Sequence, residues 1–187
     1  MYKLEEIDRR LGLLRQGQRV LDLGASPGSW SMYASTRVGG GGLVRAIDLK
    51  EAGQELPRNV DYRVQDAFEL APESLCEGGL FDVVLSDMAP STTGHRKTDQ
   101  YRSAELFDRA RSLAVAVLKP GGCFVGKIFQ GSEFEEVRDA MRPHFVKIRV
   151  IRPKATRDES YELFLIGLDS RAAGGPSSEP GSDPPAT

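Results

Sequence analysis

The sequence has few of the residues that form metal centres and disulfide frameworks. Its 187 residues include two cysteines, Cys76 and Cys123, and two histidines, His95 and His144. The cysteines are well separated and the histidines do not cluster with them, so neither a disulfide framework nor a zinc site is indicated. We therefore expect no metal ion, and a reducing, cytoplasmic setting fits this cysteine usage.

Long apolar runs and a strong net charge are also missing. No run of about 18 apolar residues that could span a membrane occurs, and the first ten residues are too charged for a secretory signal. The net charge of −2 decides nothing about nucleic acid, because a basic patch can lie on an acidic protein. With 40% hydrophobic residues the chain can bury the core of one domain, and we expect a monomer.

The two ends of the chain differ in composition. Residues 2–11 predict an amphipathic helix, because Leu4, Ile7 and Leu11 recur at helical spacing. From Ser170 onward Gly, Pro and Ser dominate and almost nothing apolar remains. We expect one folded domain at residues 1–169 and a disordered tail at residues 170–187.

The stretch at residues 20–30 is the first candidate site. It is interpreted as a buried strand, a turn containing Gly24 and Gly28, and a helix that opens near Ser29. Glycine lets the backbone turn sharply and approach a ligand closely. An α/β protein builds its nucleotide site here, at the carboxyl end of the first strand. By itself the Gly-x-x-x-Gly spacing also fits an ordinary strand-to-helix turn.

Three later strands each end beside an aspartate. Because the carboxyl ends of parallel strands meet at one edge of a sheet, these acids should surround one crevice next to the glycine turn. The strands and their acids are 43–47 with Asp48, 60–64 with Asp66, and 81–86 with Asp87.

The first two acids suit an adenosine. Asp48, at the tip of the second strand, can accept hydrogen bonds from both hydroxyls of a ribose. Asp66 can accept from the exocyclic amine of adenine, with Phe68 as an apolar wall. Two plainer interpretations stay open: Asp48 as a solvated charge, and Asp66 as the N-cap of a helix at residues 68–75.

A polar loop and a lysine within a strand follow Pro90. The loop at residues 91–100 carries His95, Arg96 and Lys97, and it is either a lid that touches substrate or a solvated connection. A helix at 103–118 leads to an apolar strand at 123–129. This strand contains Lys127, and a lysine there is costly unless it has partners, so Lys127 is the most informative single residue.

The last elements are predicted as a helix at 131–141 and an antiparallel hairpin of strands at 145–151 and 161–167, with Glu162 near the start of the second strand. A run of cations without an acid overlaps them. It is either a phosphate-contacting face or, as is usual for charge runs, a solvated surface. Its members are Arg142, Lys147, Arg149, Arg152, Lys154 and Arg157.

Four motifs follow one another along the chain. They are Asp22-Leu23-Gly24-Ala25-Ser26-Pro27-Gly28-Ser29-Trp30, Ser86-Asp87-Met88-Ala89-Pro90, Leu118-Lys119-Pro120-Gly121-Gly122 and Lys127-Ile128-Phe129-Gln130-Gly131. In combination they resemble the FtsJ/RrmJ family of S-adenosylmethionine-dependent ribose 2′-O-methyltransferases, over residues 2 to about 168. The resemblance implies a Rossmann-like class I methyltransferase: a seven-stranded, mostly parallel α/β sheet with an antiparallel last strand and helices on both faces.

The resemblance also implies the site residues and the substrates. The catalytic set would be Lys3, Asp87, Lys127 and Glu162. S-adenosylmethionine would be bound by Gly28, Trp30, Asp48, Asp66 and Asp87. The acceptor would be the ribose of a uridine in 23S rRNA, within the large ribosomal subunit.

The chemistry explains why these residue types are needed. The attacking 2′-hydroxyl must lose its proton, and Lys127 can accept it only in the neutral form, which burial and the nearby cation Lys3 favour. Asp87 and Glu162 favour the charged form, so we assign them to orienting the lysines. Asp87 would also contact the methionine end of the cofactor. Alignment of the hydroxyl with the methyl group can supply more rate than proton removal.

Other functions stay open at this stage. A tRNA ribose methyltransferase shares the four catalytic residues, although the compact Ser-Asp-Met-Ala-Pro motif favours rRNA. A ribosome-assembly factor can bind S-adenosylmethionine without turnover. A nicotinamide-dependent dehydrogenase needs Gly-x-Gly-x-x-Gly, and here Ala25-Ser26-Pro27 occupies the middle of the turn.

Overall fold

A single mixed β-sheet forms the centre of the molecule. The computed structural model describes residues 2–154 and 161–172. Within them seven strands pair in the order β3-β2-β1-β4-β5-β7-β6, all parallel except β7, which runs antiparallel to both neighbours. The strands are β1 (Arg19–Leu23), β2 (Leu43–Asp48), β3 (Val60–Val64), β4 (Phe81–Ser86), β5 (Leu118–Phe129), β6 (Phe145–Ile151) and β7 (Glu162–Ser170).

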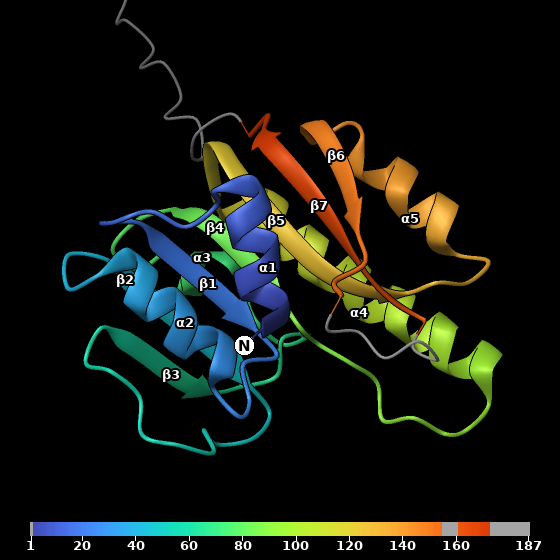
Figure 1. Cartoon of the computed structure of the whole chain (residues 1–187), viewed down its shortest axis with the longest axis horizontal. Coiled ribbons are helices and arrows are strands. Elements are labelled where there is room, and N and C mark those ends of the chain that lie inside the picture. Colours follow the sequence, from blue (N-terminus) through green and yellow to red (C-terminus); the bar gives the residue numbers. More distant parts are fainter. Residues whose placement is uncertain (1, 155–160, 173–187) are drawn as a thin grey trace, which may run out of the picture.

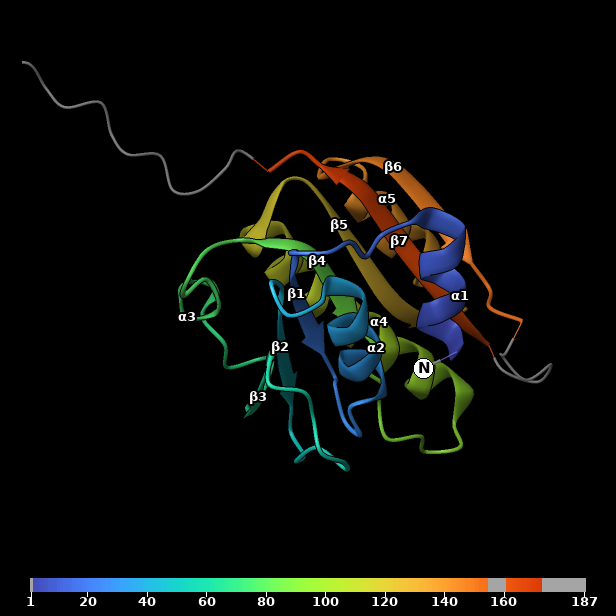
Figure 2. The ribbon, with the colours of Figure 1, turned by 60° about the vertical axis from the view of Figure 1, so that its left-hand side comes forward.

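Helices cover both faces of the sheet (Figure 1). One face packs against α1 (Tyr2–Leu11) and α2 (Ser29–Val38), through a cluster that includes Leu4, Trp30 and Phe164. The other face packs against α3 (Pro72–Leu75), α4 (Arg96–Val117) and α5 (Phe134–Met141). Figures 1 and 2 agree that α1 lies beside β7, so the start of the chain meets its last strand.

The expected class is confirmed: the sheet has seven strands, is mostly parallel, and ends in the antiparallel hairpin of β6 and β7. Two strands, β5 and β7, were predicted too short. β5 begins at Leu118, opposite Phe81, and its register then shifts so that Cys123 lies opposite Val83. The residues between these two positions of β5 include Gly121, which adopts a left-handed φ of 77°. The disordered tail was predicted from residue 170, but Ser170 is still part of β7; residues 173–187 of that prediction lie outside the described residues.

Two helices were predicted with wrong bounds. The helix expected at residues 103–118 already begins at Arg96, so the loop expected at residues 91–100 ends at His95. Asp99 fixes this start: its Oδ1 accepts hydrogen bonds from the backbone N and Oγ1 of Thr93, both at 2.9 Å. The first turn of α4 is largely exposed and polar, so it lacks the apolar periodicity that would have revealed a helix.

The helix expected at residues 68–75 is reduced to Pro72–Leu75, and Ala71 is its N-cap residue. Asp66 therefore does not cap a helix. Its Oδ1 accepts a hydrogen bond from the backbone N of Phe68 at 2.9 Å, which makes a local turn after β3. Within the described residues no helix is both long and apolar enough to cross a membrane.

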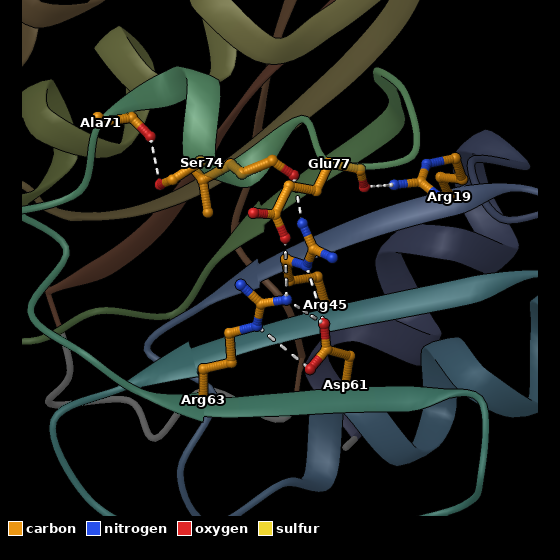
Figure 3. Close-up of polar contacts among 8 residues, drawn as sticks. Arg19, Arg45, Asp61, Arg63, Ala71, Ser74 and Glu77 are labelled. Atoms are coloured by element: carbon orange, nitrogen blue, oxygen red, sulfur yellow. Dashed lines mark hydrogen bonds and ion pairs between the residues drawn. The ribbon is translucent and has the colours of Figure 1, made fainter.

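A polar network ties the edge strand β3 and its neighbour β2 to the end of α3 and the residues after it (Figure 3). Arg45 is 5% exposed, and its guanidinium contacts Asp61 Oδ2 at 3.1 Å and the carbonyl of Leu75 at 2.5 Å. Arg63 also contacts Asp61 Oδ2, at 3.0 Å. Burial opposes the charge of Asp61, but these two arginines outweigh it and lower the pKa of Asp61. Asp61 therefore stabilises the fold at neutral pH, and this contribution is lost as the pH falls below about 4.

We predict that Arg45→Leu lowers the free energy of unfolding by about 1–3 kcal/mol at pH 7, because it leaves the carbonyl of Leu75 without its partner and weakens the pairing of Asp61. Arg63→Leu is the matched control, and because Arg63 is one-third exposed its effect should be below about 1 kcal/mol. Urea unfolding of both variants measures the difference. Equal losses would contradict the assignment of Arg45 as the central residue of the network.

Candidate active site

The glycine turn after β1 is held against two neighbouring strands. Gly24 has a φ of 75°, and a Cβ at this position would lie 2.7 Å from the backbone N of Met88. The N of Gly24 donates to the carbonyl of Ile47 at the end of β2, and the N of Asp87 donates to the carbonyl of Leu23. The ends of β1, β2 and β4 thus meet at one point of the carboxyl edge.

A cavity of about 530 Å³ opens beside this turn. It is lined by Asp48, Asp66 and Asp87, so the structure brings together the three carboxylates that follow successive strands. Phe68 lines the same cavity and leaves 53% of its surface exposed, as an apolar wall would. The arrangement offers hydrogen-bond acceptors and an aromatic surface to a ligand with hydroxyls and a heteroaromatic ring.

Asp48 has a structural contact as well. Its Oδ2 accepts a hydrogen bond from the N of Ser26 in the glycine turn, and its Oδ1 accepts one from the N of Lys50, both at 2.9 Å. An ionised carboxylate offers about four acceptor positions, so both oxygens can accept further hydrogen bonds from a ligand. Asp48 therefore links the shape of the turn to the cavity.

A second cavity, of about 270 Å³, lies on the side of α1. Lys3 and Trp30 line it, and it shares Gly24, Ser26 and Asp87 with the first cavity. Trp30 is 5% exposed, and its ring packs against Phe164 at a centroid distance of 5.6 Å. Asp87 thus stands where the two cavities meet.

Two lysine–carboxylate pairs form beside Asp87. The Nζ of Lys127 lies 3.0 Å from Asp87 Oδ1 and donates to the Asp87 carbonyl at 2.8 Å. The Nζ of Lys3 donates to both oxygens of Glu162, at 2.8 and 2.9 Å. Lys127 is 9% exposed, and pairing with Asp87 explains how the strand accommodates it.

The four charged groups influence one another. Burial raises the pKa of Asp87, and the charge and contact of Lys127 partly offset this rise. Glu162 raises the same pKa further and Lys3 lowers it, which places all four groups within one electrostatic environment. Residues that lie at positions 3, 87, 127 and 162 of the chain therefore form one cluster.

Gly28 is placed differently from the other proposed cofactor residues. It is not among the residues that line either cavity, and its missing side chain faces Leu56 and Gln54. Its φ of 108° is the reason for glycine, since it turns the chain into α2. In this structure Gly28 shapes the turn, while Gly24, which was predicted only as a turn residue, borders both cavities.

Asp22 belongs to the site region and was missed as a functional candidate. It is fully buried in β1; its Oδ2 accepts from the Ser31 hydroxyl at 2.6 Å, and its Oδ1 has no hydrogen-bond partner within the described residues. Burial raises the pKa of Asp22 to about 7, and Asp87 and Asp48 add to the rise against the Ser31 hydrogen bond. The available signal was an acid inside an apolar strand, directly before the glycine turn.

The sheet order, the antiparallel β7 and the cavity at the carboxyl edge define a Rossmann-like class I methyltransferase fold. A crystal structure of a ribosomal RNA methyltransferase from Plasmodium falciparum shares this fold, with a TM-score of 0.79 at 22% identity. The match covers 90% of this chain and 95% of that one. The fibrillarin pre-rRNA processing protein of Methanococcus jannaschii matches with a TM-score of 0.57 at 19% identity, over 83% of this chain and 67% of that one.

Sequence comparison gives the family. The model of the FtsJ-like methyltransferases matches residues 1–170. Two proteins named Ribosomal RNA large subunit methyltransferase E are similar: that of Sorangium cellulosum is 53% identical over 93% of this chain and 82% of its own, and that of Oleidesulfovibrio alaskensis is 48% identical over 90% and 83%. The chain belongs to the FtsJ-like methyltransferase family, as its motifs indicated, and is a methyltransferase.

We predict that Asp22→Asn removes a pH dependence of stability. The pKa of Asp22 is higher in the folded than in the unfolded state, so the free energy of unfolding falls as the pH rises from about 4 to 7. The variant should be more stable than the wild type at pH 8, by on the order of 1–4 kcal/mol, and equal to it below about pH 4. Urea unfolding across this range measures it. The exposed control Glu55→Gln should show the same pH dependence of stability as the wild type. If the stability of Asp22→Asn also changes with pH in parallel with the wild type, the assignment to Asp22 is disproved.

Gly24→Ala should lower the free energy of unfolding by about 1–3 kcal/mol and reduce methyl transfer, because the new Cβ would collide with the backbone of Met88 beside Asp87. Gly12→Ala is the control for backbone conformation, since Gly12 has a φ of 62° and nothing within 4 Å of an added Cβ. Gly12→Ala should show the smaller loss and unchanged transfer. Similar results for both would mean that the close approach to Met88 has no effect of its own.

Proposed function

We propose that this chain transfers a methyl group from S-adenosylmethionine to the 2′-oxygen of a uridine ribose in the 23S rRNA of the large ribosomal subunit. The observation that supports this best is the position of Lys127, which contacts Asp87 where the two cavities meet. Lys127 lines neither cavity itself, so the hydroxyl would have to be held beside Asp87 to reach the Lys127 Nζ. We further propose that the chain acts as a monomer in the cytoplasm.

The first cavity fits the adenosine part of S-adenosylmethionine. Asp48 would accept hydrogen bonds from the ribose hydroxyls and Asp66 from the adenine amine, with Phe68 against the ring. Gly24 and Asp87 line both cavities, and in the second one Trp30 and Asp87 would contact the methionine part. Bound there, the cofactor supplies a methyl group on a positively charged sulfur. Gly28 would act through the shape of the turn.

The residues of the chain position the acceptor and accept its proton. As the new carbon–oxygen bond forms and the carbon–sulfur bond breaks, the 2′-hydroxyl loses a proton, which we assign to the Nζ of Lys127. Lys127 must be neutral at that moment. Asp87 fixes the position of the Lys127 amine, and the Lys3–Glu162 pair holds a second cation beside it. Alignment of the hydroxyl with the methyl group would supply further rate.

The names of the relatives support rRNA as the acceptor. The proteins of Sorangium cellulosum and Oleidesulfovibrio alaskensis are both named for methylation of large-subunit ribosomal RNA. Because this chain covers more than 80% of their lengths, we extend the substrate class to it. A tRNA acceptor, and a role as a cofactor-binding assembly factor without turnover, are the outcomes against which the proposal is tested.

We predict that Lys127→Met lowers the rate of methyl transfer by about 10²–10⁴-fold, because it removes the proton acceptor. Labelled S-adenosylmethionine would be incubated with large ribosomal subunits, free rRNA or tRNA, and the labelled ribose identified. Lys119→Met is a matched control: Lys119 lies in the same strand and pairs with Asp82 at 2.8 Å, but near the opposite end of β5. It should retain the wild-type rate.

The outcomes separate the alternatives. Label at a ribose 2′-oxygen of 23S rRNA that is lost in Lys127→Met supports the proposal. Label in tRNA instead would mean that tRNA, and not rRNA, is the acceptor. Cofactor binding without label in any RNA would indicate an assembly factor, and binding of NAD in its place would indicate a dehydrogenase. If the ratio of wild-type to Lys127→Met rates stays constant with pH, Lys127 does not act as the base.

A further inference from the structure

An exposed aromatic ring stands next to the Lys3–Glu162 pair. Tyr161 directly precedes Glu162, the first residue of β7, and 45% of its surface is exposed. Its carbonyl accepts a hydrogen bond from the backbone N of Gln130 at 2.8 Å, just after the end of β5. Tyr161 is thereby fixed at the carboxyl edge of the sheet, beside the cluster that would receive the acceptor.

Arg96 lies over the ring of Tyr161. The guanidinium carbon is 3.6 Å from the ring centroid, which is a close cation–π contact. Arg96 is the first residue of α4, and the Asp99–Thr93 hydrogen bonds fix the loop just before it. An exposed arginine and an exposed tyrosine from distant parts of the chain are therefore held together, although neither contributes to the core.

The position of this pair follows from the geometry of a strand. Successive side chains of an extended chain point to opposite faces of the sheet. Glu162 points towards α1, where it binds Lys3, and Tyr161 contacts the start of α4, which covers the other face. An RNA strand that brings a ribose to Lys127 from this edge would meet both Glu162 and Tyr161.

We propose that Tyr161 and Arg96 form a stacking platform for a nucleobase that flanks the methylated nucleotide. This inference rests on the proposed function. Single-stranded RNA is bound through bases that stack on exposed aromatic rings or on arginine guanidinium groups. Arg96 covers one face of the ring, so a base would stack on the guanidinium or on the other face, and its positive charge also favours the phosphate backbone. Because every base has a π-face, the platform would tolerate different flanking bases.

The kinetic test uses methyl transfer to large ribosomal subunits. We expect Tyr161→Ala to raise KM for the RNA acceptor about tenfold, with KM for S-adenosylmethionine unchanged, because stacking acts on the RNA alone. Tyr161→Phe keeps the ring and should keep the wild-type KM, whereas Tyr161→Leu keeps an apolar side chain and should behave like Tyr161→Ala. Tyr101→Ala removes a tyrosine of α4 that is more exposed than Tyr161 and lines the groove against α5, and it should have no effect.

The binding test uses a uridine-rich RNA 12-mer that carries one 2-aminopurine, whose fluorescence falls when it stacks. We expect quenching by the wild type and Tyr161→Phe, weaker quenching by Arg96→Ala, and none by Tyr161→Ala or Tyr161→Leu. Unchanged acceptor KM and unchanged quenching in Tyr161→Ala, with an active wild type, would overturn the platform and leave the proposed function standing. Absence of transfer to any RNA by the wild type would overturn the proposed function, and the quenching would then decide on the platform alone.

Discussion

The close approach of Gly24 to the backbone of Met88 is the constraint on which the site depends. A Cβ at Gly24 would lie 2.7 Å from the N of Met88, so the end of β1 and the segment after β4 can touch only because that side chain is missing. The contact places Asp87 beside the glycine turn, and Gly24 and Asp87 both line the two cavities. The Asp48 side chain reinforces the turn from the opposite side, through the N of Ser26.

The electrostatics of the site are a balance between paired and unpaired charges. Lys127 and Asp87 form one pair and Lys3 and Glu162 another, so two lysines occupy a small region with little net charge. Asp22 is the exception, since burial raises its pKa to about 7 and one of its oxygens has no partner within the described residues. A carboxyl group of this kind lowers stability when it is charged, which is a cost that active sites often carry.

The antiparallel strand β7 brings Glu162 into contact with helix α1 at the start of the chain. It pairs with β5 so that Glu162 lies opposite Phe129, two residues beyond Lys127 on the same face. Helix α1 packs on that face, and Lys3 reaches Glu162 across 159 positions of sequence. Reversal of this one strand also directs its first residues to the carboxyl edge, where Tyr161 meets Arg96. The cluster and the proposed platform therefore have a common topological origin.

Much of the fold and part of the site could be predicted from the sequence. The apolar strands, the glycine turn and the acids after β2, β3 and β4 indicated the sheet and its cavity, because strand period and parallel order depend on local patterns. The exposed first turn of α4 was missed and the helix at residues 68–75 was predicted too long, since side-chain contacts of Asp99 and Asp66 decide these boundaries rather than apolar spacing. The pairing of Lys127 with Asp87 and of Lys3 with Glu162 was suggested by resemblance to a family, not by periodicity.

By itself, the sequence determined which residues were available: an acid inside β1, a lysine inside β5, and glycine where no side chain fits. Only the tertiary structure decided what these residues contact. Gly28 faces Leu56 rather than a cavity, and Arg96 covers Tyr161 from 65 positions away. Burial and charge pairing depend on distances across the sheet, and the one-dimensional pattern does not contain those distances.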